Sequence, residues 1–370
     1  MKHILKLTLV LMLFLTIVIF SGTALATNGY QLIGVGQVQK SMAGAVTAAP
    51  LDAMTGITNP AGMARVGERA DFSMEAFMPV RSVNFSAMGG GNTEGGSELY
   101  GIPSVGWVAK AFNRDDVYFG GGMFATSGLG VDYGEVLMMP GAALDAMAGV
   151  AAGTHSNVTF DGFSAIQFWK MAPTVAWDVN DGLSLGASLN VDYQSVTIRE
   201  RLRNVPFDPA SPAYTQMDVN LDLGRPTNQL GVGATFGLLY DVTEKVTVGF
   251  SYSSEQVFGD GDYRVGTGDV QNYNGAVGAA GIYQLDLDYP QQAAVGLAFH
   301  PNKEWLIDFD IKWLNWSGTH DKVTLKGPAN SFDTNMDSVG DSNQTKLEFG
   351  WEDQYIYAIG AQYKLTDRLV

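Results

Sequence analysis

The chain of 370 residues contains no cysteine, so it has no disulfide framework and no thiol nucleophile. Charged residues make up only 16% of the sequence, which is unlike the composition of a disordered chain. Beyond residue 26, no stretch has the roughly 18 consecutive apolar residues that indicate a membrane-spanning helix. These absences predict a folded chain that is stabilised by extensive hydrogen bonding and not by covalent cross-links.

Basic residues and catalytic motifs are also scarce. The sequence has 22 basic and 38 acidic residues, and this net charge of −16 argues against a nucleic-acid partner. Neither a Gly-x-Ser-x-Gly nor a His-Glu-x-x-His motif occurs, so we expect no catalytic residues and no enzymatic activity. Asp260 and Asp262 stand two positions apart, but no complete calcium loop follows them. We therefore expect neither a metal nor a cofactor.

The first 26 residues have the features of an export signal. Lys2 and Lys6 give a positive start, Leu7 to Phe20 is largely apolar, and Ala24-Leu25-Ala26 is a small-x-small cleavage site. The apolar run is shorter than the roughly 20 residues that a spanning helix needs. The sequence therefore predicts a cleaved signal peptide at residues 1–26 and an exported mature chain.

The mature chain consists of alternating segments whose connectors are short and long in turn. The short connectors are Asn113 to Asp116, Asn180 to Gly182, Asp241 to Lys245, His300 to Glu304 and Leu365 to Arg368. The long ones lie roughly at 86–98, 127–160, 203–214, 258–282 and 317–345. Outer-membrane barrels have short periplasmic turns and long external loops, so this rhythm predicts an all-β transmembrane barrel.

Residue alternation within the segments supports the same fold. From Leu183 to Gln194, every odd position is apolar and every even position is glycine, polar or charged. A membrane barrel turns the apolar face toward lipid and the polar face toward its lumen, and Trp169 and Trp177 fit interfacial girdles. We expect a multi-pass protein of the outer membrane of a Gram-negative bacterium, surrounded by outer-membrane lipid and monomeric.

The strand count predicts an unfinished barrel. We expect ten strands, at about 70–85, 99–112, 116–126, 161–179, 183–202, 215–240, 245–257, 283–299, 304–316 and 346–364. The sequence then turns and stops at Val370, where an eleventh strand should begin. Because open strand edges in lipid leave backbone groups unpaired, we expect the chain to be truncated within the barrel, which occupies residues 70–370.

Residues 27–69 lack the alternation of the later strands. Small residues and short helical stretches dominate this segment, and Pro60 sets a local turn. Small side chains allow close packing against a barrel wall. The segment therefore predicts a small N-terminal hatch of short helices, folded as a plug inside the lumen.

Several sequence pieces resemble the FadL family of outer-membrane transporters for long-chain fatty acids and other hydrophobic molecules. They are Gly29-Tyr30-Gln31-Leu32, Asn59-Pro60-Ala61, Pro173-Thr174-Val175-Ala176-Trp177, Trp313-Leu314-Asn315-Trp316-Ser317 and Trp351-Glu352-Asp353-Gln354-Tyr355. The resemblance implies a 14-stranded barrel, of which about ten strands are present here. It also implies that the first two pieces belong to the hatch.

The resemblance further implies a route for a hydrophobic substrate by passive diffusion. In the family, outer loops capture the substrate, an inner pocket near the N-terminus binds it, and a kink in the third strand lets it leave sideways. Here we expect capture at Leu137, Met138, Met139, Leu144 and Met147, or alternatively a short helix over the barrel mouth at this place. We expect the lateral opening at Gly120, Gly121 and Gly122, since glycine within a strand marks a bend.

The chemical nature of the ligand stays open at the level of sequence. By face parity Lys170 and Lys312 point into the lumen, where they could pair with a carboxylate head group or with Asp308 and Asp310. A neutral hydrocarbon would need neither lysine. Two other functions also remain, a general diffusion porin and a surface receptor or adhesin, although a plug argues against the porin.

Overall fold

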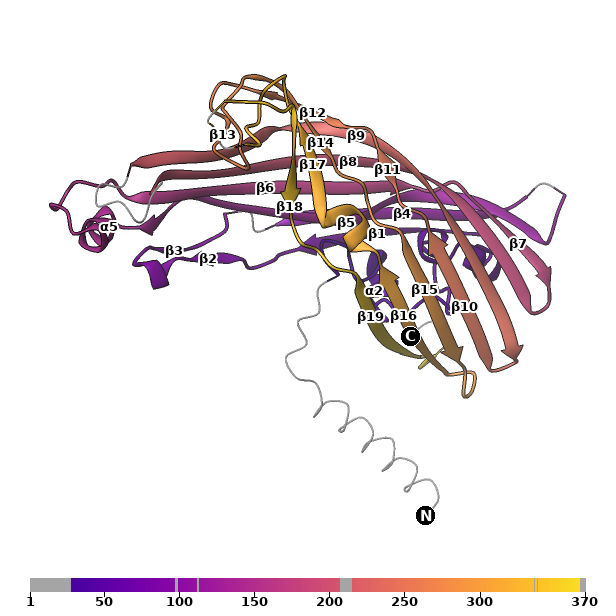
Figure 1. The fold of residues 1–370 in the computed structure, drawn as a ribbon. Helices are drawn as coiled ribbons and strands as arrows, with labels where there is room; N and C mark the ends of the chain where they lie inside the picture. The colour runs from indigo at the N-terminus through magenta and orange to yellow at the C-terminus, as the bar shows by residue number, and fades with distance from the viewer. Residues whose placement is uncertain are drawn as a thin grey trace, which may run out of the picture.

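The computed structural model describes residues 28–96, 99–111, 113–206, 215–335, 337 and 339–366, apart from the side chain of Pro226. The predicted signal peptide at 1–26 lies outside these residues, as do Asp367 to Val370. Figure 1 shows a long, curved antiparallel sheet with the N-terminal helices on its inner side. No helix among the described residues is both long enough and apolar enough to cross a membrane.

The main sheet follows the chain from one neighbouring strand to the next. Its path is β1-β4-β5-β6-β8-β9-β10-β15-β16-β19, and each successive pair is antiparallel. The strands are β1 (Arg69–Phe77), β4 (Tyr100–Lys110), β5 (Val117–Met139), β6 (Val158–Met171), β8 (Leu183–Pro206), β9 (Gln216–Thr243), β10 (Val246–Ser253), β15 (Gln292–Phe299), β16 (Trp305–Leu314) and β19 (Gln354–Tyr363). This path of ten strands confirms the predicted barrel topology.

Three short strands complete this sheet. β7 (Thr174–Asn180) continues the line of β6 after a break at Ala172 and Pro173, and it pairs with β5 and β8. The other two, β11 (Val257–Phe258) and β13 (Val270–Gln271), pair with β9. The predicted segment 161–179 is therefore one line of the wall interrupted at a proline, which cannot donate a ladder hydrogen bond.

Several predicted loop boundaries are wrong. β5 runs on to Met139, so residues 127–139 are strand and the connector spans only 140–157. The predicted strand 283–299 is two strands of different sheets, β14 (Gly281–Asp286) and β15, and 346–364 is likewise split into β18 (Gln344–Glu348) and β19. Outside the membrane a strand no longer needs an apolar face, so its glycine-rich and acidic sequence looks like that of a loop.

The two faces of the wall alternate as the sequence predicts. On β8, Leu185 and Leu189 are 37% and 56% exposed, whereas Ser184, Ser188 and Asn190 are buried. On β9 the exposed apolar side chains extend from Leu230 to Val242. The twelve residue steps between them rise about 30 Å at about 3.3 Å per residue and a tilt of about 40°, which is enough to span the apolar band of about 25 Å of a membrane barrel. The outward face therefore meets lipid and the inward face lines the lumen.

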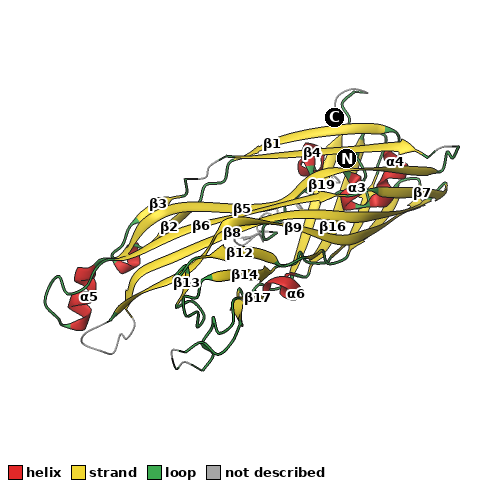
Figure 2. Ribbon diagram, turned by 90° about the horizontal axis from the view of Figure 1, so that it is seen from above, coloured by secondary structure: helices red, strands yellow, loops and turns green. Residues whose placement is uncertain are grey.

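Residues 28–68 form short helices on the inward face. They are α2 (Gly36–Ser41), α3 (Thr55–Thr58), the 3-10 helix η1 (Pro60–Gly62) and α4 (Met63–Val66). Figure 2 shows α3 and α4 at the end of the sheet that carries β7, far from α5 (Gly141–Ala148). We call residues 28–68 the N-terminal segment.

Inward-facing glycines of the wall let the N-terminal segment approach closely. At Gly237 a Cβ would lie 2.1 Å from Asn59 Oδ1, and at Gly249 it would lie 2.2 Å from the Thr47 carbonyl oxygen. Four further wall glycines have contacts of under 3.0 Å with the backbone of the segment, namely Gly106, Gly186, Gly296 and Gly360. The backbone of the segment therefore lies directly on the backbone of the wall.

A smaller sheet packs beside β9 toward the outer end of the main sheet. It has the order β12-β14-β17-β18 and contains β12 (Gly261–Val265) and β17 (Lys322–Lys326) in addition to β14 and β18. Its inner face contributes Tyr263, Tyr283 and Leu325 to the largest apolar core, which also contains Phe168 and Trp316. The segments predicted as external loops at 258–282 and 317–345 are thus partly ordered strands.

The outer tip carries a separate hairpin. It consists of β2 (Ser82–Asn84) and β3 (Asn92–Glu94), joined through the 3-10 helix η2 (Ser86–Met88). The backbone of Gly91 donates a hydrogen bond of 2.7 Å to the Leu137 carbonyl oxygen, which attaches this hairpin to the distal end of β5.

Candidate functional site

A cavity of about 60 Å³ lies between the N-terminal segment and the inner wall. Residues 31–35 and 44–47 form one side of it, and inward-facing side chains of β5, β6, β9, β10, β15 and β16 form the other. Its polar lining includes Gln31, Gln39, Thr47, Thr58, Thr126, Lys170, Thr235, Ser251, Ser253, Gln292 and Lys312. Its apolar lining includes Leu32, Ile33, Val35, Val46, Ile57, Ala293 and Ala294.

Both predicted lumen lysines lie on this cavity. Lys170 is 4% exposed, and its ammonium lies 6.0 Å from the centroid of the Phe168 ring. Among the residues that the structure describes, neither Lys170 nor Lys312 forms an ion pair, although Asp192 and Asp310 interact with them over longer distances. Asp308 and Asp310 therefore form no direct ion pair with the lysines, and both lysine side chains line the cavity.

Asp310 instead holds the N-terminal segment in place. Its Oδ2 accepts hydrogen bonds from the backbone nitrogens of Val46 (2.9 Å) and Thr47 (3.0 Å) and from Thr47 Oγ1 (2.7 Å). At the periplasmic side, Arg65 binds Asp241 at 2.8 Å and Ser184 at 2.7 Å. Charge-assisted hydrogen bonds of this kind are about twice as strong as neutral ones, so they fix the segment to the wall.

The residues predicted to belong to a hatch lie at two separate places in the N-terminal segment. Asn59 donates from Nδ2 to the carbonyl oxygens of Thr47 (2.7 Å) and Leu238 (3.1 Å), and its Oδ1 caps η1 at Ala61. Pro60 is the first residue of η1 and is buried. At the other end Gln31 pairs with Ser127, and Leu32 N donates to the Thr126 carbonyl oxygen at 2.9 Å.

Aromatic side chains enclose Tyr30 at the outer end of the cavity. The ring centroids of Tyr289, Trp316, His320 and Trp351 lie between 5.0 and 6.0 Å from that of Tyr30. Tyr30 Oη lies 3.0 Å from His320 Nε2, while His320 Nδ1 is 2.7 Å from Thr319 Oγ1. Burial lowers the pKa of His320 to about 4, so the ring is neutral at pH 7. Gly29 lies against this cluster, with a Cβ position 2.7 Å from Trp351.

The predicted glycines lie at a break in the wall. β5 is the third strand of the path, and its ladder to the next wall line is formed at Gly120↔Thr174 and at Met123↔Met171. Between them, Gly121 has a φ of 151° and stands opposite Pro173, which has no N–H to donate. One weak hydrogen bond of 3.3 Å, from Ala172 N to the Gly122 carbonyl oxygen, crosses this gap.

A cluster of buried apolar side chains separates the cavity from this break. It comprises Val35, Met54, Ile57, Phe124 and Ala172. Phe124 has no exposed surface, and a Cβ at Gly122 would lie 2.4 Å from its ring. None of the three glycines lines the cavity itself. Phe124 and its neighbours therefore fill the space between the cavity and the wall at these glycines.

The predicted capture residues lie at the far outer tip. Leu137, Met138 and Met139 end β5, so they are strand residues and not part of a loop. Met147 on α5 is 67% exposed, whereas Leu144 is only 1% exposed. Leu144 is therefore part of the packed interior of the tip, and its inclusion in an exposed capture surface is wrong.

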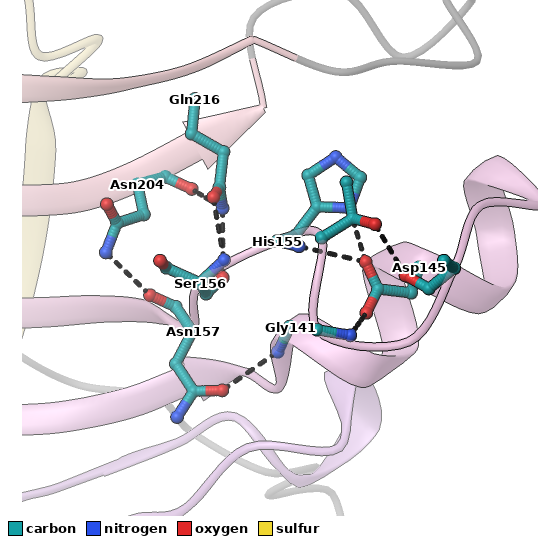
Figure 3. A network of polar contacts seen from close by, with 10 residues as sticks. Gly141, Asp145, His155, Ser156, Asn157, Asn204 and Gln216 are labelled. Atoms are coloured by element: carbon teal, nitrogen blue, oxygen red, sulfur yellow. Dashed lines mark hydrogen bonds and ion pairs between the residues drawn. The ribbon is translucent and has the colours of Figure 1, made fainter.

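A polar network fixes the connector that follows α5. His155 Nδ1 lies 2.7 Å from Asp145 Oδ1, whose carboxylate also accepts from the backbone nitrogens of Gly153 and His155. Figure 3 shows that this pair connects through Ser156 to Gln216 on β9. The expected alternative of a short helix at this place is present as α5, and it is held by polar contacts on its inner side.

Sequence reasoning did not single out Phe124 or the wall glycines at 237 and 249, and it considered Asp310 only as a partner of the lumen lysines. Phe124 has the ordinary appearance of an inward strand residue, and only its packing against the N-terminal segment gives it a role. The glycines carried a detectable signal, since they recur at inward-facing positions where larger polar residues would be normal. Such a recurrence indicates close approach of another backbone.

The fold and the filled lumen define a class: outer-membrane β-barrel proteins with an N-terminal segment inside the wall. A model of the family described as "Outer membrane protein transport protein (OMPP1/FadL/TodX)" matches residues 17–370, and the chain belongs to this family. This confirms the resemblance predicted from sequence and places the protein as a multi-pass component of the Gram-negative outer membrane. No match to a curated protein sequence was found.

Solved structures share the same fold. The chain is 20% identical to the toluene transporter TbuX of Ralstonia pickettii, with a TM-score of 0.63, over 91% of this chain and 84% of TbuX. The chain is 17% identical to the toluene transporter TodX of Pseudomonas putida, with a TM-score of 0.63, over 92% of this chain and 82% of TodX. It is also 17% identical to a FadL homologue from Pseudomonas aeruginosa, with a TM-score of 0.60, over 92% of this chain and 78% of that homologue.

Proposed function

We propose that this protein carries hydrophobic small molecules passively across the outer membrane. The observation that carries the proposal is the position of the internal cavity. Only the apolar cluster around Phe124 separates it from a break in the wall at Gly121, beyond which lies lipid. The solved structures that resemble this chain include transporters of toluene, a neutral hydrocarbon.

The proposed route avoids water along its whole length. A ligand is captured near Met147, Leu137, Met138 and Met139 at the outer tip, binds in the inner cavity, and leaves sideways between β5 and the break at Pro173. Each buried CH₂ group is stabilised by about 0.8 kcal/mol relative to water, so a water-filled pore would hold such a ligand poorly. Passage into the bilayer keeps the ligand in apolar surroundings, and its concentration gradient supplies the driving force.

Ligand binding requires the N-terminal segment to move. The cavity of about 60 Å³ is smaller than the roughly 150 Å³ of a dry protein cavity that accepts benzene. Residues 31–35 and 44–47 form the side of the cavity that is not part of the wall, so their displacement enlarges it without opening the ladder. In this proposal residues 27–69 act as the hatch.

The two unpaired lysines favour a ligand with a negatively charged head group. A carboxylate in the cavity would accept charge-assisted hydrogen bonds from Lys170 and Lys312, while its hydrocarbon chain would contact Ile57 and Val35. A hydrophobic acid is therefore the preferred substrate class. The cavity offers no comparable gain to a neutral hydrocarbon.

Uptake measurements test this proposal. Cells that lack their own transporter should take up radiolabelled oleate faster when they express the full-length protein, and toluene uptake should rise less. Gly121→Trp should abolish the increase, because a side chain there has no room beside Ala172 and closes the break. Val175→Trp is a matched control, since Val175 is 54% exposed on the outward face of neighbouring β7.

Two outcomes would refute the proposal. In the first, neither ligand is taken up and small sugars leak through instead, which would identify a porin. In the second, Gly121→Trp assembles normally and transports as fast as the parent, which would exclude the lateral exit.

A further inference from the structure

A row of arginines lies on the outward face of the wall, beyond the lipid band. Arg199 and Arg201 on β8 have the same parity as the lipid-facing Leu185 and Leu189. The β6–β8 register is unbroken from Val191 to Arg203, and the extra residues at the register shift between β8 and β9 near Val196 belong to β9. Their neighbours across the ladder, Phe163 and Asp222, share this face. The row therefore belongs to the outer surface of the barrel and not to its lumen.

The height of this row follows from the outer edge of the apolar band. Trp169, Tyr193 and Leu230 are direct cross-strand neighbours on β6, β8 and β9, and they end the band on its external side. Arg199 is six positions further along β8. With about 3.3 Å per residue and a tilt of about 40°, it stands about 15 Å above this edge. The phosphorylated saccharide of the outer leaflet lies at this level.

A cleft of about 360 Å³ opens beside the row. Its lining contains four arginines, Arg199, Arg201, Arg225 and Arg264, and two aspartates, Asp222 and Asp269. The lining thus has an excess of two positive charges, in a chain whose net charge is −16. An acidic chain is expected to have a mainly negative surface, so this positively charged cleft stands out from the composition.

Two of the four arginines form ion pairs with aspartates. Asp161 accepts from Arg199 at 3.1 Å, and Asp222 pairs with Arg201, so the carboxylates fix these two side chains. The Arg199 guanidinium also lies 5.3 Å from the centroid of the Phe163 ring, which orients it further.

The other two arginines remain available to a ligand. Within the described part of the chain, Arg225 and Arg264 have no ion pair, and both are exposed. Asp269 Oδ2 accepts from the backbone of Gly266 at 2.8 Å and is not paired with either of them. The cleft therefore presents two unneutralised guanidinium groups beside two fixed ones.

We infer that this cleft binds a phosphate group of lipopolysaccharide in the outer leaflet. Guanidinium forks match phosphate oxygens in pairs, and with Asp161 counted, the four arginines and three aspartates leave one positive charge for a phosphate to balance. The outward orientation and the height above the apolar band favour a lipid-borne phosphate over a free one. The site would fix the rotational position of the barrel wall at β8 and β9 against its surrounding lipid.

Binding of lipopolysaccharide to the full-length protein in detergent tests the inference. The probe is lipopolysaccharide with a short, phosphorylated core, titrated by microscale thermophoresis. Arg225→Gln combined with Arg264→Gln should weaken binding at least about tenfold, because two charge-assisted contacts are lost. Lys245→Gln combined with Lys303→Gln is the matched control, since it removes the same charge from exposed periplasmic turns and should leave the affinity unchanged.

Three further measurements distinguish a charge effect from misfolding, and a lipid-borne phosphate from a free one. Arg225→Lys combined with Arg264→Lys keeps the charge but loses the paired hydrogen bonds of the guanidinium, so its affinity should lie between those of the parent and the Gln pair, which also shows that the substituted site folds. Enzymatically dephosphorylated lipopolysaccharide should bind the parent weakly. Inorganic phosphate at millimolar concentration should not displace the lipid.

Four results would overturn the inference. They are undetectable lipopolysaccharide binding by the parent, equal binding by the Gln pair and the parent, equal binding of the dephosphorylated lipid, and full displacement by inorganic phosphate. The last result would assign the cleft to a free anion.

Discussion

Gly237→Ala tests whether the N-terminal segment is held by direct contact with the wall. The new Cβ would lie 2.1 Å from Asn59 Oδ1 and 2.8 Å from Pro60 Cδ, so η1 has to move away from β9. Overpacking of this kind costs about 1–3 kcal/mol. Displacement also strains the hydrogen bond from Asn59 Nδ2 to the Leu238 carbonyl oxygen, which contributes about 1 kcal/mol.

These contributions predict that local opening of the segment becomes easier by about 2–4 kcal/mol. Amide hydrogen exchange of residues 55–64 should therefore accelerate about 30- to 1,000-fold, while the ladder amides of β8 and β9 should stay protected. Gly259→Ala is the matched control, because a Cβ at Gly259 meets nothing within 4 Å. Unchanged exchange in Gly237→Ala would refute the reasoning that wall glycines position the segment.

Three further predictions concern the cavity and its surroundings. Burial lowers the pKa of His320 from 6.5 to about 4, so the unfolded chain binds a proton more readily between these values and the fold loses stability as the pH falls from 6.5 to 4. The protection factor of the Tyr30 amide, which corrects for the intrinsic pH dependence of exchange, should therefore fall across this window, but not in His320→Gln. Phe124→Ala should raise the initial rate of ligand uptake by opening the path to the wall, whereas Phe124→Leu should stay near the parent. Lys170→Met combined with Lys312→Met should lower oleate binding about tenfold or more and leave toluene binding unchanged, as measured by equilibrium dialysis.

The strand path could be predicted from sequence because lipid imposes a strict rule. Each membrane-facing position has to be apolar, so alternation from Leu183 to Gln194 fixes both the strand and its orientation. Beyond the apolar band this constraint ends. β5 therefore continues through Asp132 and Gly134, residues that resemble a loop, and its boundary could not be predicted.

The candidate site was only partly visible in the sequence. The inward parity of Lys170 and Lys312 followed from alternation, and the structure places both on one cavity. The contacts of Asp310 with Val46 and Thr47 bring together residues more than 260 positions apart, which no local pattern encodes. Leu144 was misassigned because an apolar residue in a connector can pack inward as well as outward.

Transfer of a fluorescent fatty acid into proteoliposomes measures the central claim most directly. The claim predicts that the full-length protein speeds transfer into the bilayer, that Gly121→Trp removes this effect while Val175→Trp does not, and that an entrapped small sugar stays inside. Rapid loss of the sugar, or transfer by Gly121→Trp at the rate of the parent, would contradict lateral transport of a hydrophobic ligand.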